Sequence, residues 1–246
     1  MNETRFNSEY TERCRDYFKT EYPQGATFFI QNEGCQMNSL QTETVAGMAL
    51  QMGLTETTEE QNASVVIYNT CTVRENANQK IYGHLGGLKS IKRKNPGLKI
   101  VLFGCMMQEH HVIEKIRKDY PFVDVVFGTH NIHKFPELFY RSLMGNSQII
   151  DIWEDSDEIV EGLPTARKYS FKTGVNIMFG CNNFCSYCIV PYVRGREKSR
   201  EPVSILRELE TLAAQGVSEV MLLGQNVNSY GKTLDIPVSF AELLKE

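Results

Sequence analysis

Short apolar runs alternate with helix-like stretches along the first 145 residues, and this alternation constrains the fold more than any other feature. Each run is four to eight residues long and rich in Val, Ile and Phe, as expected for a buried strand. In chain order, strand then helix, they stand at 26–31 and 38–52, 63–69 and 73–94, 98–104 and 108–120, and 122–128 and 132–144. Strands that alternate with helices predict an α/β fold with a parallel sheet and helices on its faces.

The alternation stops after residue 145 and resumes at residue 174. The intervening stretch is acidic in its middle and contains Pro164, so it reads as a linker with an edge strand at QIIDI. The expected organisation is a polar, loosely ordered lead-in over 1–25, an α/β domain over 26–145, a linker over 146–173 and a second domain over 174–246. Because a complete (β/α) barrel needs roughly 200 residues, we expect the second domain to be the first part of a larger one.

The composition excludes some classes of protein. The net charge is −4, and no apolar run approaches the ~20 residues of a membrane span. The N-terminus lacks the basic start and apolar core of a signal peptide. These features predict a cytoplasmic protein with no membrane partner. In a reducing compartment, clusters among the seven cysteines are metal ligands or catalysts rather than disulfides.

Three cysteines each follow a predicted strand of the first domain. Cys35, Cys71 and Cys105 come after the first, second and third strands. Since the carboxyl ends of parallel strands lie along one edge, we expect these thiols to converge there. The spacing leaves open whether they would hold zinc or an iron–sulfur cluster with one open iron. Cys14 has no such context and reads as a spare thiol.

A denser cysteine group lies in GCNNFCSYCIVPYVRGREKSR, residues 180–200. Cys181, Cys185 and Cys188 form a C-x3-C-x2-C pattern, and three thiolates on one loop can hold three corners of a cubane cluster. A zinc knuckle would need a fourth Cys or His nearby. The chain has no cysteine after Cys188.

The pattern C-x3-C-x-aromatic-C, with Tyr187 as the aromatic residue, resembles the signature of the radical S-adenosylmethionine (SAM) superfamily. The resemblance implies a [4Fe-4S] cluster on Cys181, Cys185 and Cys188 whose open iron binds SAM. It also implies that Tyr187 lies near the adenine of SAM, and that the loop follows the first strand of a partial (β/α) barrel.

The segments NEGCQMN, NTCTVRE and the cysteine loop together resemble the radical SAM methylthiotransferases over residues 25–246. LLGQNVNSYG (222–231) resembles the branch that acts on tRNA, the MiaB type. Sister branches act on threonylcarbamoyl-adenosine in tRNA or on a ribosomal protein.

The family resemblance implies two [4Fe-4S] clusters, the second on Cys35, Cys71 and Cys105, with SAM as radical source and methyl donor. The implied reaction places a methylthio group on C2 of N6-isopentenyladenosine next to the anticodon. It requires tRNA, an electron donor such as a flavodoxin or ferredoxin, and a sulfur source.

Two further sets of residues are candidate ligand contacts. Gln225 and Asn226 follow a predicted strand, where radical SAM proteins commonly contact the methionine end of SAM, although such residues also cap loops. Arg194, Arg196, Lys198 and Arg200 alternate, so an extended segment would present them on one face to RNA phosphates. They could equally pair with Glu197 and Glu201.

An alternative function for the whole chain is that of a zinc-binding RNA adaptor, which would be colourless and would not cleave SAM.

Overall fold

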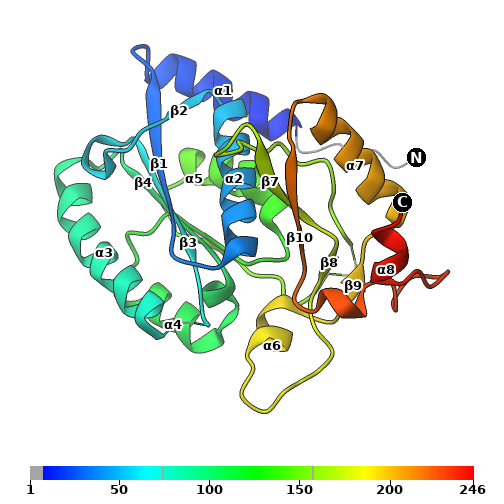
Figure 1. The fold of residues 1–246 in the computed structure, drawn as a ribbon. Helices are drawn as coiled ribbons and strands as arrows, with labels where there is room; N and C mark the ends of the chain where they lie inside the picture. The colour runs from blue at the N-terminus through cyan, green and yellow to red at the C-terminus, as the bar shows by residue number, and fades with distance from the viewer. Residues whose placement is uncertain (1–7, 74, 157) are drawn as a thin grey trace. The chain divides into compact units, whose positions relative to one another are not determined.

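A computed structural model of the protein describes residues 8–73, 75–156 and 158–246. The chain divides into two compact units, Met1–Ala166 and Arg167–Glu246, and each has its own core. Figure 1 traces the elements of both. Among the helices of the described residues, none has the length and apolar content needed to cross a membrane.

Within the described part of the first unit, six strands form one parallel sheet in the order β2-β1-β3-β4-β5-β6. The strands are β1 (Ala26–Asn32), β2 (Leu54–Glu56), β3 (Val65–Thr70), β4 (Lys99–Gly104), β5 (Val125–Phe127) and β6 (Ile149–Asp151). The four strands expected over 26–128 are confirmed, as is the edge strand at QIIDI. β2 was missed because three residues are too few to carry a pattern.

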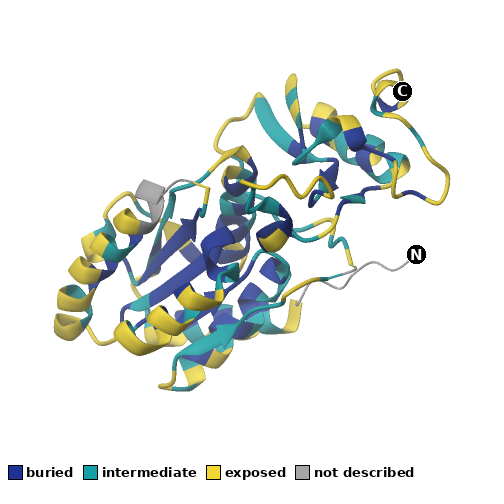
Figure 2. Cartoon of the chain, turned by 90° about the horizontal axis from the view of Figure 1, so that it is seen from below, coloured by how far each residue is buried: buried dark blue, intermediate teal, exposed yellow. Residues whose placement is uncertain are grey.

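Helices cover both faces of this sheet, as the alternation predicts. One face packs against α1 (Ser8–Glu21), α2 (Gln36–Gln51) and α5 (Phe135–Met144), and the other against α3 (Glu75–Lys94) and α4 (His110–Asp119). Short 3-10 turns stand at Glu60–Asn62, Cys105–Gln108 and Ile132–Lys134. Figure 2 shows the buried strands between helices whose outer faces are exposed. Almost all residues of strands β3, β4 and β5 are buried, which explains why each strand is a continuous apolar run in the sequence.

The strand order reverses direction between β1 and β3. After β1 the chain passes through α2 to β2 on one side, and it then returns to lay β3 on the other side of β1. In open parallel sheets of this kind, ligands bind outside the carboxyl ends of the strands at that switch point. The ends of β1 and β3 are therefore the expected place for a site.

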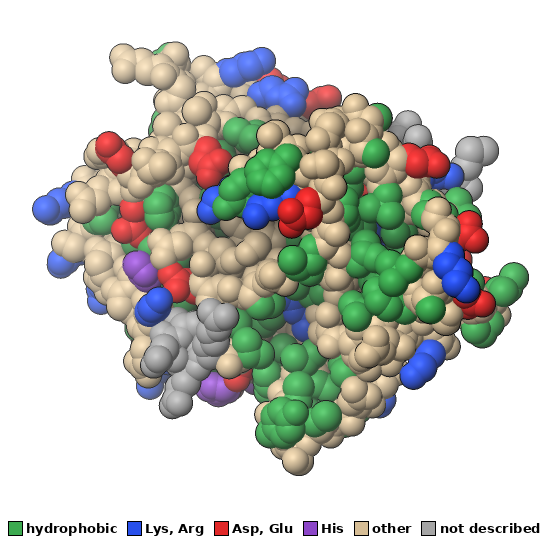
Figure 3. All heavy atoms as spheres, viewed as in Figure 1, with side chains coloured by type: hydrophobic (Ala, Val, Ile, Leu, Met, Phe, Trp, Pro, Cys, Tyr) green, Lys and Arg blue, Asp and Glu red, His purple; other side chains and the backbone are tan. Residues whose placement is uncertain are grey.

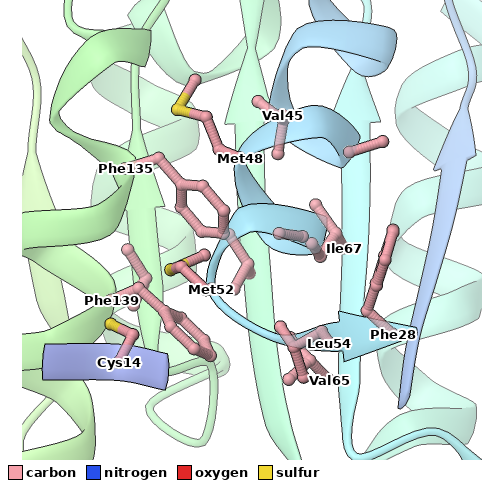
Figure 4. Close-up of a cluster of buried hydrophobic side chains, with 14 of the residues drawn as sticks. Cys14, Phe28, Val45, Met48, Met52, Leu54, Val65, Ile67, Phe135 and Phe139 are labelled. Carbon is pink, nitrogen blue, oxygen red and sulfur yellow. The ribbon is translucent and has the colours of Figure 1, made fainter. Parts of the chain in front are cut away.

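The N-terminal segment differs from the loosely ordered lead-in expected over 1–25. Residues 8–21 form helix α1, in which Cys14 and Phe18 belong to the core of the first unit. Phe18 stacks on Phe139 of α5 with ring centroids 6.1 Å apart, and Figure 4 shows Cys14 beside Phe139. The helix was underestimated because its apolar stripe is narrow and the rest of its surface is charged.

The end of the segment expected as a linker packs on α2. The backbone N–H of Ala166 donates to the carbonyl of Glu43 over 2.8 Å, and Leu163 contacts the core. A Cβ on Gly47 would lie 2.7 Å from the backbone of Pro164, so only glycine permits this approach.

The described part of the second unit begins a second parallel sheet. β7 (Lys172–Asn176) pairs in parallel with β10 (Glu219–Leu223), and β8 (Met178–Phe179) pairs antiparallel with β9 (Lys198–Ser199). The connecting elements are α6 (Val190–Arg194), α7 (Pro202–Ala214), a 3-10 turn at Val227–Ser229 and α8 (Phe240–Leu243). From β7 through α7 to β10 the chain follows the strand and helix alternation that the sequence predicts to resume at residue 174.

We expect Phe18→Ala to lower the free energy of unfolding of the first unit by roughly 3–5 kcal/mol, because a buried aromatic ring leaves a cavity. Lys19→Ala, on the exposed side of the same helix, should change it little. Thermal unfolding of both variants checks this. Equal melting temperatures for Phe18→Ala and the unaltered protein would mean that α1 does not belong to the core.

Candidate functional site

Three cysteines lie at the carboxyl edge of the first sheet, around its switch point. Cys35 follows β1 and immediately precedes α2, Cys71 follows β3, and Cys105 follows β4. The last residues of β3 and β4, Thr70 and Gly104, are paired in register, so Cys71 and Cys105 leave the sheet from adjacent positions. Cys35 is exposed, whereas Cys71 and Cys105 are buried.

One side-chain amide contacts two of these thiols. The Sγ atoms of Cys35 and Cys105 lie 3.5 Å and 3.6 Å from the Oδ1 atom of Asn38. The Nδ2 atom of the same amide donates to the carbonyl of Thr70 over 2.9 Å, next to Cys71. The structure thus gathers the three cysteine-bearing loops around Asn38, while the convergence of the three thiols themselves stays a prediction.

The close approach of β3 and β4 depends on Gly104. Its φ of +109° is a conformation that other residues rarely adopt, and a Cβ there would lie 2.4 Å from Oδ1 of Asn69 and 2.5 Å from the carbonyl of Thr70. Any other residue at 104 would push the loop of Cys105 away from that of Cys71.

The donor chemistry of this edge fits an iron–sulfur cluster. All of its cysteines are free thiols, and thiolate sulfur is the ligand that such clusters take. Among the described residues, no three His, Cys, Asp or Glu side chains converge tightly enough to hold a single metal ion. In a cubane cluster each cysteine ligates a different iron. The cysteine sulfurs around a cluster are therefore farther apart than the sulfurs that ligate a single metal ion.

The second group of cysteines lies on the loop between β8 and α6. Gly180 opens it with a φ of +68°, and a Cβ there would lie 2.0 Å from the carbonyl of Arg196. The N–H of Cys181 donates to the carbonyl of Gly195 over 3.2 Å, and that of Cys188 to the carbonyl of Cys185 over 2.9 Å. Cys181 is buried at the base of the loop, Cys185 is exposed and Cys188 is intermediate, so the three thiols differ in their access to solvent.

Exposed aromatic side chains surround this loop. Tyr187, the aromatic residue of the signature, is 90% exposed, and Phe184 and Tyr192 are 39% and 67% exposed. The rings of Phe184 and Tyr192 meet edge to face at 5.8 Å, and the guanidinium of Arg196 lies 4.6 Å from the ring of Phe184. Hydrophobic side chains are visible at this end of the second unit in Figure 3. Stacking on flat rings and guanidinium planes is a common way to hold a nucleobase.

The basic run does not form one exposed face, so this part of the prediction was wrong. Arg194 is buried in the last turn of α6, and Gly195 (φ +75°) turns the chain before β9. Arg200 is 7% exposed, pairs with Glu208 at 2.7 Å and donates to the carbonyl of Asn176 at 2.7 Å. Only Arg196 is exposed, and Lys198 is partly exposed. Two of the four candidate RNA contacts are therefore buried, and one of them, Arg200, anchors the fold of the second unit.

The loop after β10 is bound to the basic run. The Nδ2 atom of Asn226 donates to the hydroxyl of Ser229 over 2.7 Å across the turn at 227–229, an ordinary loop contact. The N–H of Gly231 donates to the hydroxyl of Ser199 over 2.9 Å, and Tyr230 donates to the carbonyl of Arg200 over 2.8 Å. Gln225 lies at the carboxyl end of β10, on the same edge as the end of β7. This edge is where a ligand of the cysteine loop would also meet the 225–231 segment.

Glu197 joins the two segments. Its N–H donates to Oδ1 of Asn182 over 3.1 Å, and its carboxylate is bonded to the backbone of Asn182 and to Ser229. Burial raises the pKa of this carboxyl above its usual range, against the opposing effects of Lys232 and these bonds. The residue after Cys181 is thereby fixed to the loop after β10.

Two family profiles match the chain, one in each unit. Residues 27–128 match the Uncharacterized protein family UPF0004, and residues 175–245 match the Radical SAM superfamily. The first contains Cys35, Cys71 and Cys105, and the second contains the cysteine loop.

Curated relatives match both units together. A tRNA-2-methylthio-N(6)-dimethylallyladenosine synthase of Lachnoclostridium phytofermentans is 61% identical over 219 residues, 89% of this chain and 48% of that protein. The protein of the same name from Caldicellulosiruptor saccharolyticus is 50% identical over 242 residues, 98% of this chain and 50% of its own length. The chain is thus similar to these tRNA methylthiotransferases over 89–98% of its own length. It spans about half the length of the curated relatives that it matches.

A solved structure shares the fold of this chain. It is a radical S-adenosylmethionine methyltransferase from Kitasatospora setae with cobalamin and a [4Fe-4S] cluster bound. The TM-score is 0.50 at 16% identity, over 83% of this chain and 50% of that one.

Sequence reasoning missed the polar residues that hold the cysteine-bearing loops in place. Asn38 and Asn69 are fully buried, and Glu197 is 7% exposed. Asn38 stands three residues after Cys35, on the same face of the first turn of α2. Asn69 interrupts an apolar strand. This polar residue, at a position where the strand pattern predicts an apolar one, was the signal in the sequence that could have identified Asn69.

Cys14 is structural. It is fully buried, its Sγ atom lies 3.7 Å from the carbonyl oxygen of Pro136, and burial raises the pKa of its thiol to about 12.

We therefore expect iodoacetamide at pH 8 to label exposed Cys35 and Cys185 in the native, metal-free protein while Cys14 stays unlabelled until denaturant is added. Mass spectrometry of tryptic peptides reads this directly. Labelling of Cys14 at the rate of Cys185 would contradict its place in the core.

We expect Arg200→Met to lower the free energy of unfolding of the second unit by roughly 1–3 kcal/mol, because Glu208 and the carbonyl of Asn176 lose a charged donor. Arg196→Met is the matched control, since its guanidinium lies on the surface. Denaturant unfolding of both variants separates them. Equal losses would mean that Arg200 is not the buried anchor described above.

Proposed function

We propose that the protein adds a methylthio group to C2 of N6-isopentenyladenosine (dimethylallyladenosine) next to the anticodon of tRNA. The observation that carries the proposal is the presence of two separate three-thiol sets, one in each family-matched unit. Relatives at 50–61% identity are named for that product. Because the chain spans half of those relatives, the reaction is proposed for the protein of which such a chain forms part.

The second unit would bind SAM and start the reaction. Cys181, Cys185 and Cys188 would ligate a [4Fe-4S] cluster through three irons and leave the fourth for the amino acid end of SAM. When bound, this cluster would supply the electron that cleaves SAM and yields the radical that takes hydrogen from C2. The residues of the chain fix the ligands, because Gly180 and Glu197 hold the base of the loop. Tyr187, Gln225 and Asn226 are the proposed SAM contacts.

The first unit would hold the cluster associated with sulfur insertion. Cys35 stands at the N-terminus of α2, where the helix dipole favours the negative charge of a thiolate. Cys71 and Cys105 are buried beside it, which keeps water from two of the three ligands. Three protein ligands leave one iron accessible for a sulfur-bearing group.

The RNA would be held by the surface around the cysteine loop. Arg196 and Lys198 are the members of the basic run that remain accessible for phosphate contact. In Figure 3, positive and negative side chains are interspersed over the visible face, in keeping with the net charge of −4. Affinity for tRNA would therefore depend on local contacts rather than on the overall field. We propose a cytoplasmic protein that takes electrons from a flavodoxin or ferredoxin and sulfur from a separate source.

The sister branches differ in substrate. The segment LLGQNVNSYG supports the isopentenyladenosine branch over those acting on threonylcarbamoyl-adenosine or a ribosomal protein. The names of the relatives support the same branch.

Iron analysis tests the proposal. The protein, reconstituted with iron and sulfide without oxygen, should bind about eight irons per chain, and Cys181→Ala/Cys185→Ala/Cys188→Ala about four. The triple variant should also lose cleavage of SAM to 5′-deoxyadenosine. Cys14→Ser is the matched control, and it should keep about eight irons.

Zinc in place of iron, with no cleavage of SAM, would replace this proposal with the zinc-binding RNA adaptor. About four irons falling to none in the triple variant would remove the cluster assigned to the first unit.

A further inference from the structure

Asn38 is a fully buried polar residue that has no role in the proposed reaction. It lies in the first turn of α2 and touches every cysteine-bearing loop of the first unit. Its Oδ1 atom faces the Sγ atoms of Cys35 and Cys105, and its Nδ2 atom faces the carbonyl of Thr70, the residue before Cys71. A buried amide costs free energy unless its hydrogen bonds are satisfied, so its position calls for a physical reason.

The orientation of the Asn38 amide is dictated by its neighbours. The Thr70 carbonyl can only accept, so the NH₂ group must face it. That NH₂ group also lies 3.1 Å from Oδ1 of Asn69. The Nδ2 atom of Asn69 donates to the carbonyl of Asn38 over 2.7 Å and to the hydroxyl of Thr42 over 3.0 Å, which fixes the second amide as well. The amide oxygen of Asn38 is thereby left facing the two thiols.

Two glycines leave space for this pair of amides. A Cβ on Gly34 would lie 2.5 Å from Nδ2 of Asn38, and a Cβ on Gly104 would lie 2.4 Å from Oδ1 of Asn69. Both glycines immediately precede a cysteine of the set, Cys35 and Cys105. The chain around the thiols is therefore shaped to fit the amides.

We propose that Asn38 is the positioning residue of the first thiol set in the metal-free protein. It receives hydrogen bonds from the thiols of Cys35 and Cys105 at one oxygen, and through Thr70 it holds the loop of Cys71 beside them. The identity of the incoming ligand as an iron–sulfur cluster rests on the proposed function, whereas the positioning does not.

The chemistry limits the contacts to the state before ligation. A cysteine that ligates iron is a thiolate, which has no proton to donate to an amide oxygen. The two S–H···O contacts are therefore lost when the ligands bind. Asn38 acts by presenting the thiols together beforehand, and its removal should change thiol reactivity and loading rather than bond strength in the finished site.

The test compares Asn38→Leu with Thr42→Val in the full chain. Leucine has nearly the shape of asparagine and removes both amide functions. Valine at 42 removes a hydroxyl that donates to the carbonyl of Asn38 over 2.8 Å and accepts from Asn69, but that contacts no sulfur. Thr42→Val thus measures the effect of disturbing the same hydrogen-bond network without removing a contact to sulfur.

The first readout is alkylation of Cys105 by iodoacetamide in the metal-free protein, followed by mass spectrometry. We expect Asn38→Leu to speed the labelling of Cys105 several-fold, with Thr42→Val close to the unaltered protein. Labelling of Cys105 that is unchanged in Asn38→Leu, or equally fast in both variants, would overturn the proposal.

The second readout is the rate of iron uptake by these variants in the Cys181→Ala/Cys185→Ala/Cys188→Ala background. Slower uptake in Asn38→Leu alone supports the proposal, and equal uptake in both variants contradicts it. If no iron binds with Asn38 intact while the labelling still differs, the positioning role stands and the cluster assignment fails.

Discussion

The parallel pairing of β3 with β1 on one side and β4 on the other is the constraint on which the first unit depends. It reverses the strand order beside β1 and brings three strand ends to one edge. β3 and β4 are buried on both faces, so a shift in their register would displace apolar side chains from two cores at once. This pairing of the strands determines where the cysteine-bearing loops leave the sheet. The loops of Cys35, Cys71 and Cys105 leave the same edge because the strands that precede them are neighbours in the sheet.

The same edge requires polar groups inside the protein. Where the strands end, backbone groups of β3 and β4 lose their ladder partners and need others. Asn38 donates to the carbonyl of Thr70 at the end of β3, and Thr70 donates from its hydroxyl to the carbonyl of Phe103 over 2.7 Å. The second unit solves the corresponding problem with Glu197, Ser199 and Arg200, which bind the cysteine loop and the 225–231 segment to the start of its sheet. In both units, buried polar residues hold the loops that carry the cysteines.

The sequence predicted the sheet because β1, β3, β4 and β5 are short apolar runs bounded by glycine or polar residues. It predicted the placement of the cysteines because that follows from strand ends alone. It missed β2, α6 and β9, which have two to five residues each and carry no periodic signal. It misjudged the basic run because alternation implies one face only if the chain stays extended, and Gly195 turns it. The roles of Asn38 and Glu197 depend on partners distant in sequence, such as Thr70 and Ser229, which no local pattern reveals.

The central claim is that three strand ends present one ligand set. An anaerobic crystal structure of the reconstituted protein, with an anomalous difference map recorded at the iron edge, tests it most directly. The account predicts a compact iron peak within bonding distance of the sulfur atoms of Cys35, Cys71 and Cys105. A second, separate peak should lie on Cys181, Cys185 and Cys188. An iron peak at the first edge that lacks one of its three sulfurs, or that is ligated by other residues in its place, would contradict the account.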